Sequence, residues 1–178
     1  LRRARNSAQR RLLDEVEAIA LIGSYSLDSA SGRWVSSKCL NAILGIDAEF
    51  DRSVEGWAAL IHPDDRKATV AYLANDVLGG GRGFNREYRI VRGSTGEVRY
   101  VHGRGTLRLD ASGRPQQLFG TIADITDRRA GEIDRARLTL AVEHVSNAVI
   151  LTDPAGTIEY VNPAFERISG YGCDSVVG

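Results

Sequence analysis

Few cysteines, no methionine and no long apolar run mark this sequence of 178 residues. The two cysteines, Cys39 and Cys173, lie far apart. Neither a disulfide framework nor a metal-ligand pattern is therefore expected, and a reducing, cytoplasmic setting is favoured. No stretch of about 18 apolar residues is present to span a membrane, and no signal peptide is recognisable. Because the chain starts at Leu1 instead of Met, we expect it to be a segment of a longer protein.

An excess of charge of one sign is also lacking. The 23 lysines and arginines balance the 23 aspartates and glutamates, and the isoelectric point is about 7.0. This balance offers no general attraction for nucleic acid or for an anionic membrane surface, so neither is expected as a partner. No Gly-x-Ser-x-Gly or His-Glu-x-x-His motif occurs, and the glycine run 79–83 is not followed by Gly-Lys-Ser/Thr. We therefore expect no catalysis within this segment.

Hydrophobic periodicity and turn residues predict an α+β fold. Residues 3–21 have the pattern of an amphipathic helix, and two short strands, several helices and a three-strand meander follow. This order predicts one five-stranded antiparallel sheet with short helices on one face, flanked by an N-terminal and a C-terminal helix. The predicted strands are 24–28, 33–36, 84–92, 97–109 and 117–125, and the predicted short helices are 37–44, 54–60 and 62–78.

The end of the chain repeats its beginning. Residues 127–170 read as helix, strand, turn, strand and short helix, which is the element order of residues 3–45. About thirty residues with two strands cannot bury a core alone. We therefore expect the tail to pair with another chain, extend a sheet edge or order weakly. The predicted division is an N-terminal helix (1–21), a complete domain (22–126), a linker helix (127–147) and the first part of a second domain (148–178).

Four motifs follow one another in a fixed order along residues 20–129. They are Ile-His-Pro-Asp-Asp-Arg at 61–66, Arg-Glu-Tyr-Arg-Ile at 86–90, Gly-Glu-Val-Arg-Tyr-Val at 96–101, and Gly120 followed by Asp-Ile-Thr-Asp-Arg-Arg at 124–129. Together these motifs resemble the PAS domain with its C-terminal PAC motif. The tail, which includes Tyr-Val-Asn-Pro-Ala-Phe at 160–165, resembles the start of a second PAS domain.

The resemblance implies a sensory module of a bacterial signalling protein. PAS domains bind small ligands, haem or flavin between the sheet and the short helices, or they bind nothing and pair with another PAS domain. The helix that follows passes the signal to an output domain, often a histidine kinase or a diguanylate cyclase, which this segment lacks. Because both outputs act as dimers, the resemblance also implies a homodimer.

The cofactor signatures of the family are absent from the first domain. Haem-binding members carry a histidine further along the helix that starts at His62, where this sequence has residues such as Val70 and Tyr72. Members that form a cysteine adduct with flavin carry Gly-Arg-Asn-Cys-Arg, which does not occur. His102 and His144 have no second ligand at metal spacing, so no metal site is expected. The second domain ends before the flavin motif would fall, and its chemistry stays open.

Strand alternation identifies candidates for a ligand pocket. Tyr88 and Ile90 share one face of their strand, and Gly120 and Ile122 share one face of the last strand. Gly120 would leave room for a ligand or a closely packed helix, and Tyr88 would supply a polar group in an apolar cavity. A core filled with side chains fits the pattern equally well. The full set of candidates is Tyr25, Cys39, Tyr88, Ile90, Gly120 and Ile122.

The predicted signalling element is the sequence Asp124, Ile125 and Thr126, where the last strand ends and a helix begins. Thr126 or Asp127 can cap this helix, and Asp124 can fix the strand end to the start of the helix by hydrogen bonds. At such a junction, a shift of the sheet can become a rotation of the helix.

Two helix faces are candidates for contact with a second copy of the chain. Each has apolar residues at i, i+4 and i+7, but runs this short fit either a coiled coil or a helix that covers the outer face of the sheet. We expect a dimer contact. The two faces are Leu12, Val16 and Ile19, and Leu138, Val142 and Val145.

Overall fold

The computed structural model describes Glu17 and residues 19–178. Leu12 and Val16 lie outside the described residues, whereas Ile19 is described and is 85% exposed. The chain divides into two compact units, of which the first ends at Asp127 and the second is Arg128–Gly178.

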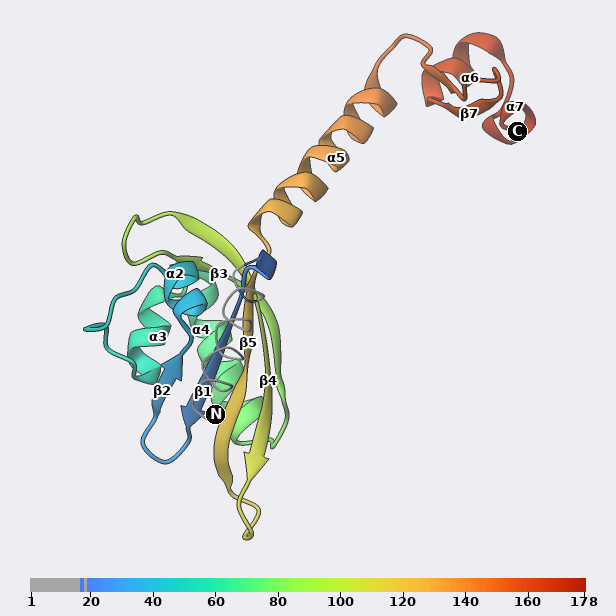
Figure 1. Ribbon diagram of the computed structural model, residues 1–178. Coiled ribbons are helices and arrows are strands. Elements are labelled where there is room, and N and C mark those ends of the chain that lie inside the picture. The colour runs from blue at the N-terminus through green and yellow to red at the C-terminus, as the bar shows by residue number, and fades with distance from the viewer. Residues whose placement is uncertain (1–16, 18) are drawn as a thin grey trace, which may run out of the picture. The chain divides into compact units, whose positions relative to one another are not determined.

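The first unit is built on one five-stranded antiparallel sheet (Figure 1). The strand order β2-β1-β5-β4-β3 places the first strand beside the last, so the chain enters and leaves the sheet through neighbouring strands. This confirms the predicted α+β class. The strands are β1 (Ile22–Asp28), β2 (Arg33–Ser36), β3 (Phe84–Val91), β4 (Val98–Leu109) and β5 (Pro115–Asp124).

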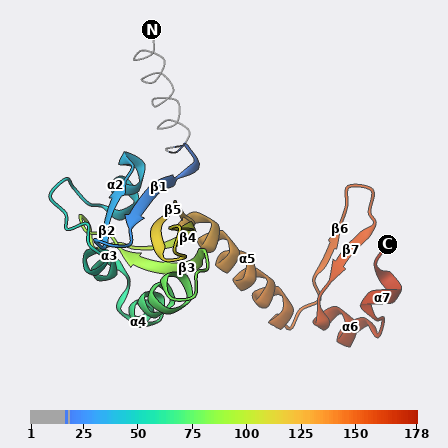
Figure 2. The same ribbon diagram turned by 90° about the horizontal axis from the view of Figure 1, so that it is seen from below.

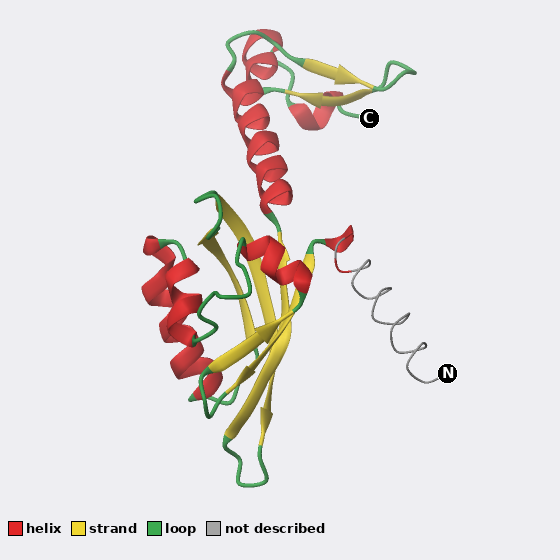
Figure 3. Ribbon diagram, turned by 60° about the vertical axis from the view of Figure 1, so that its left-hand side comes forward, coloured by secondary structure: helices red, strands yellow, loops and turns green. Residues whose placement is uncertain are grey.

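Three short helices and a π-helix connect β2 to β3 and lie on one face of the sheet (Figure 3). Helix α2 (Lys38–Leu44) begins at Ser37, whose hydroxyl accepts a hydrogen bond from the Leu40 N–H, and ends at Gly45. Gly45 has φ +65°, a left-handed conformation that glycine adopts without a Cβ penalty. Helix α3 (Val54–Leu60) begins in the same way at Ser53.

The predicted helix 62–78 consists of two parts. It begins as α4 (Pro63–Ala71) and continues as the π-helix η1 (Tyr72–Leu78). Pro63 occupies the first turn, where a missing N–H costs nothing, and two aspartates complement the helix dipole there. Apolar periodicity predicts the extent of the helix and does not distinguish α from π winding. The wider turns of a π-helix are therefore a feature that the sequence pattern did not predict.

The core lies between the inner face of the sheet and these helices. Side chains alternate along each strand, so that in β3 Phe84, Tyr88 and Ile90 all face inward and are 5% exposed or less. The core is apolar and continuous across both layers. Its buried residues are Leu27, Trp34, Leu40, Ile43, Leu44, Leu60, Ile61, Leu73, Val77, Phe84, Tyr88, Ile90, Val101, Leu118 and Ile122.

The second unit contains most of helix α5 (Thr126–His144) and a small motif after it (Figure 2). Strands β6 (Ile150–Thr152) and β7 (Ile158–Val161) form an antiparallel hairpin. Helices α6 (Pro163–Ser169) and α7 (Cys173–Val176) follow. The order β6-β7-α6 repeats β1-β2-α2. Several of its apolar side chains are exposed, namely Ile150, Leu151, Ile168, Tyr171 and Val177.

Candidate functional site

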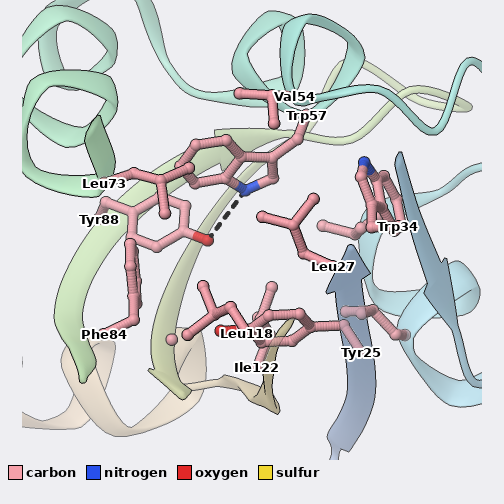
Figure 4. Close-up of a pocket in the computed structure, with 13 residues that line it drawn as sticks. Tyr25, Leu27, Trp34, Val54, Trp57, Leu73, Phe84, Tyr88, Leu118 and Ile122 are labelled. Atoms are coloured by element: carbon pink, nitrogen blue, oxygen red, sulfur yellow. Dashed lines mark hydrogen bonds between the residues drawn. The ribbon is translucent and has the colours of Figure 1, made fainter. Parts of the chain in front are cut away.

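A small cavity lies inside the first unit, between the sheet and the helices (Figure 4). Its volume is about 50 Å³, roughly a third of an apolar cavity of ~150 Å³ that admits benzene. Aliphatic and aromatic side chains make up almost the whole lining. The lining residues are Tyr25, Leu27, Trp34, Leu40, Leu44, Val54, Trp57, Leu73, Phe84, Tyr88, Gly103, Leu118 and Ile122.

Two polar groups face each other at this cavity. The Trp57 indole Nε1–H donates a hydrogen bond to the Tyr88 hydroxyl at 3.3 Å, and the two rings are nearly perpendicular at 86°. Figure 4 shows this bond at one side of the apolar space. Burial raises the pKa of Tyr88 to about 12, and burial also raises the pKa of Tyr25. Both phenols therefore stay neutral near pH 7.

Three of the predicted pocket residues line this cavity, namely Tyr25, Tyr88 and Ile122. Tyr25 comes from β1, Tyr88 from β3 and Ile122 from β5, so distant parts of the sequence meet there. Tyr88 carries the polar group that the sequence suggested.

The other three predicted pocket residues do not line the cavity. Ile90 is fully buried but pairs through its backbone with Ile61 away from this space. The thiol of Cys39 donates to the Glu17 carbonyl at 3.3 Å, outside the lining. A Cβ at Gly120 would collide with the Arg104 carbonyl oxygen of the adjacent strand. Gly120 therefore permits close approach of two strands and does not leave room for a ligand.

Sequence reasoning missed several lining residues. Trp57 lies on α3 and Leu73 on η1, and strand alternation gives no information about helices. Strand alternation could have identified Gly103, because it lies two residues after Val101 on β4 and therefore shares the inward face of that strand. A Cβ at Gly103 would lie 2.7 Å from the Phe84 ring, so this glycine makes room for the aromatic cluster.

The junction between β5 and α5 is held by side-chain and backbone hydrogen bonds. Asp124 Oδ1 accepts from the Thr126 N–H at 3.0 Å and from the Thr126 hydroxyl at 2.6 Å. The Tyr100 N–H donates to Thr126 Oγ1 at 3.0 Å, and the Ile125 N–H donates to the Tyr100 carbonyl at 2.9 Å. Ile125 itself is 8% exposed. The start of the helix is thus bonded both to β5 and to β4.

Asp124 also links the junction to a charged side chain and to the residue just before β1. Its Oδ2 lies 3.3 Å from Arg99 Nη1, and its carboxylate side chain is only 10% exposed. Arg99 in turn pairs with Glu97 at 3.0 Å, and this hydrogen bond is the main cause that raises the pKa of Arg99. The Asp124 N–H donates to the Leu21 carbonyl at 2.9 Å. One residue therefore contacts the segments that precede and follow the sheet.

Helix α5 has no buried residue. On its predicted face, Leu138 is 69% exposed and Val142 is half-buried. Val145, the third predicted member, is 41% exposed but lies just after the helix, which ends at His144 and not at 147 as the sequence predicted. Ile133 and Leu140 are exposed on another face of the same helix. An exposed apolar face of this kind is typical of a helix that packs against a partner.

A second charged pair docks α4 onto β3. Arg89 donates to Asp65 from its backbone N–H at 2.9 Å and from Nη2 at 2.7 Å. This hydrogen bond with Arg89 lowers the pKa of Asp65 to about 2. His62, which precedes the helix, accepts from the Asp64 N–H through Nδ1 and acts as its N-cap.

Two findings concern the described part of the chain as a whole. None of its helices combines the length and the apolar character that a bilayer crossing requires. Across Glu17 and residues 19–178, no three His, Cys, Asp or Glu side chains gather into a metal-binding group.

The sheet, the apolar cavity and the helix that leaves the last strand define a small sensory domain of the kind found in signalling proteins. The chain belongs to the PAS family: the PAS fold matches residues 33–122, and a PAS domain also matches residues 136–178. PAS domains are sensory modules, and this chain matches the family at two places along its length.

Relatives and solved structures agree with this membership. The blue-light-activated histidine kinase of Brucella anthropi is 26% identical over 132 residues, and the probable diguanylate cyclase DgcE of Escherichia coli is 25% identical over 126 residues. These alignments cover 74% and 68% of this chain, but only 26% and 11% of the two relatives. The chain is therefore similar to a small part of each multidomain sensor.

Among solved structures, the sensory box histidine kinase/response regulator from Burkholderia thailandensis has a TM-score of 0.58 and 27% identity. The match covers 72% of this chain and 95% of that one. The N-terminal domain of a diguanylate cyclase with a PAS/PAC sensor from Marinobacter aquaeolei has a TM-score of 0.57 and 21% identity. It covers 61% of this chain and 98% of that one, and at this identity it supports the fold alone.

Proposed function

We propose that this chain is the relay segment of a bacterial signal-transduction protein. In this proposal a first PAS domain (22–126) controls a linker helix (127–147), which leads to a second PAS domain that begins at 148. The hydrogen-bonded junction supports this most strongly, because Asp124 joins the end of β5 to the first residue of α5. The segment itself is non-catalytic and depends on an output domain elsewhere in the longer protein.

The junction suggests how the relay works. The backbone of Tyr100 on β4 binds both Ile125 and Thr126, and Arg99 on the same strand pairs with Asp124. A sliding of β4 against β5 therefore cannot occur without moving the first turn of α5. Small shifts in packed layers become discrete changes of this kind because well-packed interfaces do not deform continuously.

The input to the relay is a change in the packing of the cavity. A small apolar ligand of a few heavy atoms is the second candidate function, supported by the 50 Å³ of apolar space beside Trp57 and Tyr88. Haem or flavin would need the core to open, because such cofactors exceed this volume many times. The alternative is a ligand-free relay, in which partner contacts alone shift the sheet.

Two copies of the chain form the functional unit in this proposal. The exposed side chain of Leu138 on α5, with the exposed Val145 just after the helix, supports pairing of α5 with its counterpart in a second copy. The output is a histidine kinase or a diguanylate cyclase, as in the relatives. We place the segment in the cytoplasm, where the thiols of Cys39 and Cys173 stay reduced.

The direct test is Asp124→Ala in the full-length protein that contains this segment. We expect the activity of the output domain to become the same with and without the signal, while the protein stays folded. Asp110→Ala is the matched control, because Asp110 lies in the turn at the opposite end of the β4–β5 pair and accepts hydrogen bonds from Ser112. An unchanged response of the Asp124 variant would reject the relay through this junction.

A further inference from the structure

Asn162 in the second unit has every polar atom of its side chain engaged, although the residue is fully buried. Its Oδ1 accepts from the Val149 N–H at 2.9 Å and from the Phe165 N–H at 3.0 Å. Its Nδ2 donates to the carbonyls of Val142 and Asn147, both at 3.0 Å. Two acceptor and two donor bonds use the whole capacity of a carboxamide.

The partners of Asn162 come from the end of α5, from the connection between α5 and β6, and from α6, which follows the β6–β7 hairpin. Val142 lies in the last turn of α5, which ends at His144, so its carbonyl lacks a partner inside the helix. Asn147 lies in the connection to β6, Val149 just before that strand, and Phe165 in the first turn of α6. One side chain therefore ties the end of the linker helix to the strand and the helix that follow it.

Ser37 in the first unit makes two of the hydrogen bonds that Asn162 makes in the second unit. The same sequence offset relates Ser24 to Val149 and Ser37 to Asn162. Ser37 also caps its helix, and its hydroxyl also accepts from the equivalent backbone N–H, that of Ser24, at 3.1 Å. Capping and strand contact therefore need only an oxygen atom, which both residues supply.

The contact with the segment before the first strand is made differently in the two units. Glu17 stands at the same offset from Val142, and its carbonyl accepts from the Cys39 thiol at 3.3 Å. A thiol is a weak donor, whereas the amide of Asn162 makes an ordinary hydrogen bond to the Val142 carbonyl. Both units thus bind the carbonyl at this position, and the second unit does so with the stronger donor.

We propose that Asn162 is a positioning residue that fixes the end of α5 to the second PAS unit, so that a rotation of α5 moves β6 and α6 with it. The amide group, which capping does not require, carries this role. This proposal rests on the proposed function only in assuming that the signal passes along α5 toward the second unit. The hydrogen bonds between Asn162 and the end of α5 lie within the second unit and do not depend on that function.

The test uses two variants of the whole chain that keep an oxygen and remove the amide donors. Asn162→Asp keeps the best kind of helix cap, and Asn162→Ser copies Ser37 of the first unit. Asn147→Ser is the matched control, because the backbone carbonyl of this exposed asparagine, and not its side chain, accepts the bond from Asn162. Amide hydrogen exchange is measured residue by residue by NMR.

We expect exchange in the last turn of α5 to be about tenfold faster in both variants, with the Phe165 amide and the β6–β7 hairpin still protected. The control should match the wild type. A wild-type rate in Asn162→Asp would show that Asn162 only caps α6 and would overturn the proposal. Loss of protection throughout the second unit would overturn it too, because the residue would then hold the fold together. Failure of the relay itself would show in the Asp124 variant, at the other end of α5.

Discussion

The carboxylate of Asp124 accepts two hydrogen bonds from Thr126, of which the bond from the hydroxyl is 2.6 Å long, at the point where β5 becomes α5. Replacing Asp124 by alanine removes both bonds to Thr126 and one of the two acidic partners of Arg99. We expect a loss of about 1–2 kcal/mol in the free energy of unfolding and faster amide exchange in the first turn of α5. Thermal unfolding and hydrogen exchange measure both effects. Asp124→Asn keeps an acceptor oxygen, so its stability and its exchange rates should lie between those of the wild type and those of Asp124→Ala.

The hydroxyl of Tyr88 accepts a hydrogen bond from the indole of the half-buried Trp57. Tyr88→Phe removes this bond, and the loss of such a bond costs about 1 kcal/mol in the free energy of unfolding. Urea unfolding should show this loss with an unchanged m-value. Tyr171→Phe removes a hydroxyl from a side chain that is 64% exposed and should leave stability unchanged. Equal effects of the two variants would contradict the assigned role of Tyr88.

The Asp65–Arg89 pair predicts a response to acid. Because the pKa of Asp65 is about 2 in the folded chain and near 4 in an unfolded one, the carboxylate stabilises the fold above pH 4. This contribution is lost as the pH falls from about 4 to 2. We expect Asp65→Asn to lower the melting temperature at pH 6 and to differ less from the wild type at pH 2.5. A gap between the two melting curves that is the same at both pH values would argue against this.

The exposed face of α5 predicts a concentration-dependent dimer. Leu138→Glu places a charge on this face, so the dissociation constant measured by sedimentation should rise by at least about tenfold. Leu140→Glu is the control, because two residues along a helix turn the side chain by about 200° to another face. A wild-type chain that stays monomeric throughout the concentration series would remove the dimer from the account.

Local chemistry explains why the elements could be predicted from the sequence. The left-handed Gly45, the first-turn Pro63 and the turn residues act within a few positions of themselves. Asp124 and Thr126 were also recognisable, because their hydrogen bonds span two residues. Only three of the thirteen residues that line the cavity were among the predicted pocket residues, because the lining depends on how helices pack over the sheet.

Gly120 illustrates this limit. Alternation correctly places it on the same strand face as Leu118 and Ile122, but it gives no information about the distance to the next strand. The close approach of the Arg104 carbonyl, and not a ligand, requires a glycine there. The π-helical winding of 72–78 was likewise not predicted, because apolar periodicity does not distinguish it from α-helical winding.

Coupling between the cavity and α5 is the central claim, and a double-mutant cycle on hydrogen exchange tests it most directly. Gly103→Ala pushes a methyl group toward the Phe84 ring at the cavity, and exchange is read at the first-turn amides of α5. With Asp124 present, we predict that Gly103→Ala changes these rates severalfold; in the Asp124→Ala background it should change them little. The same change in both backgrounds, or none in either, would contradict the account.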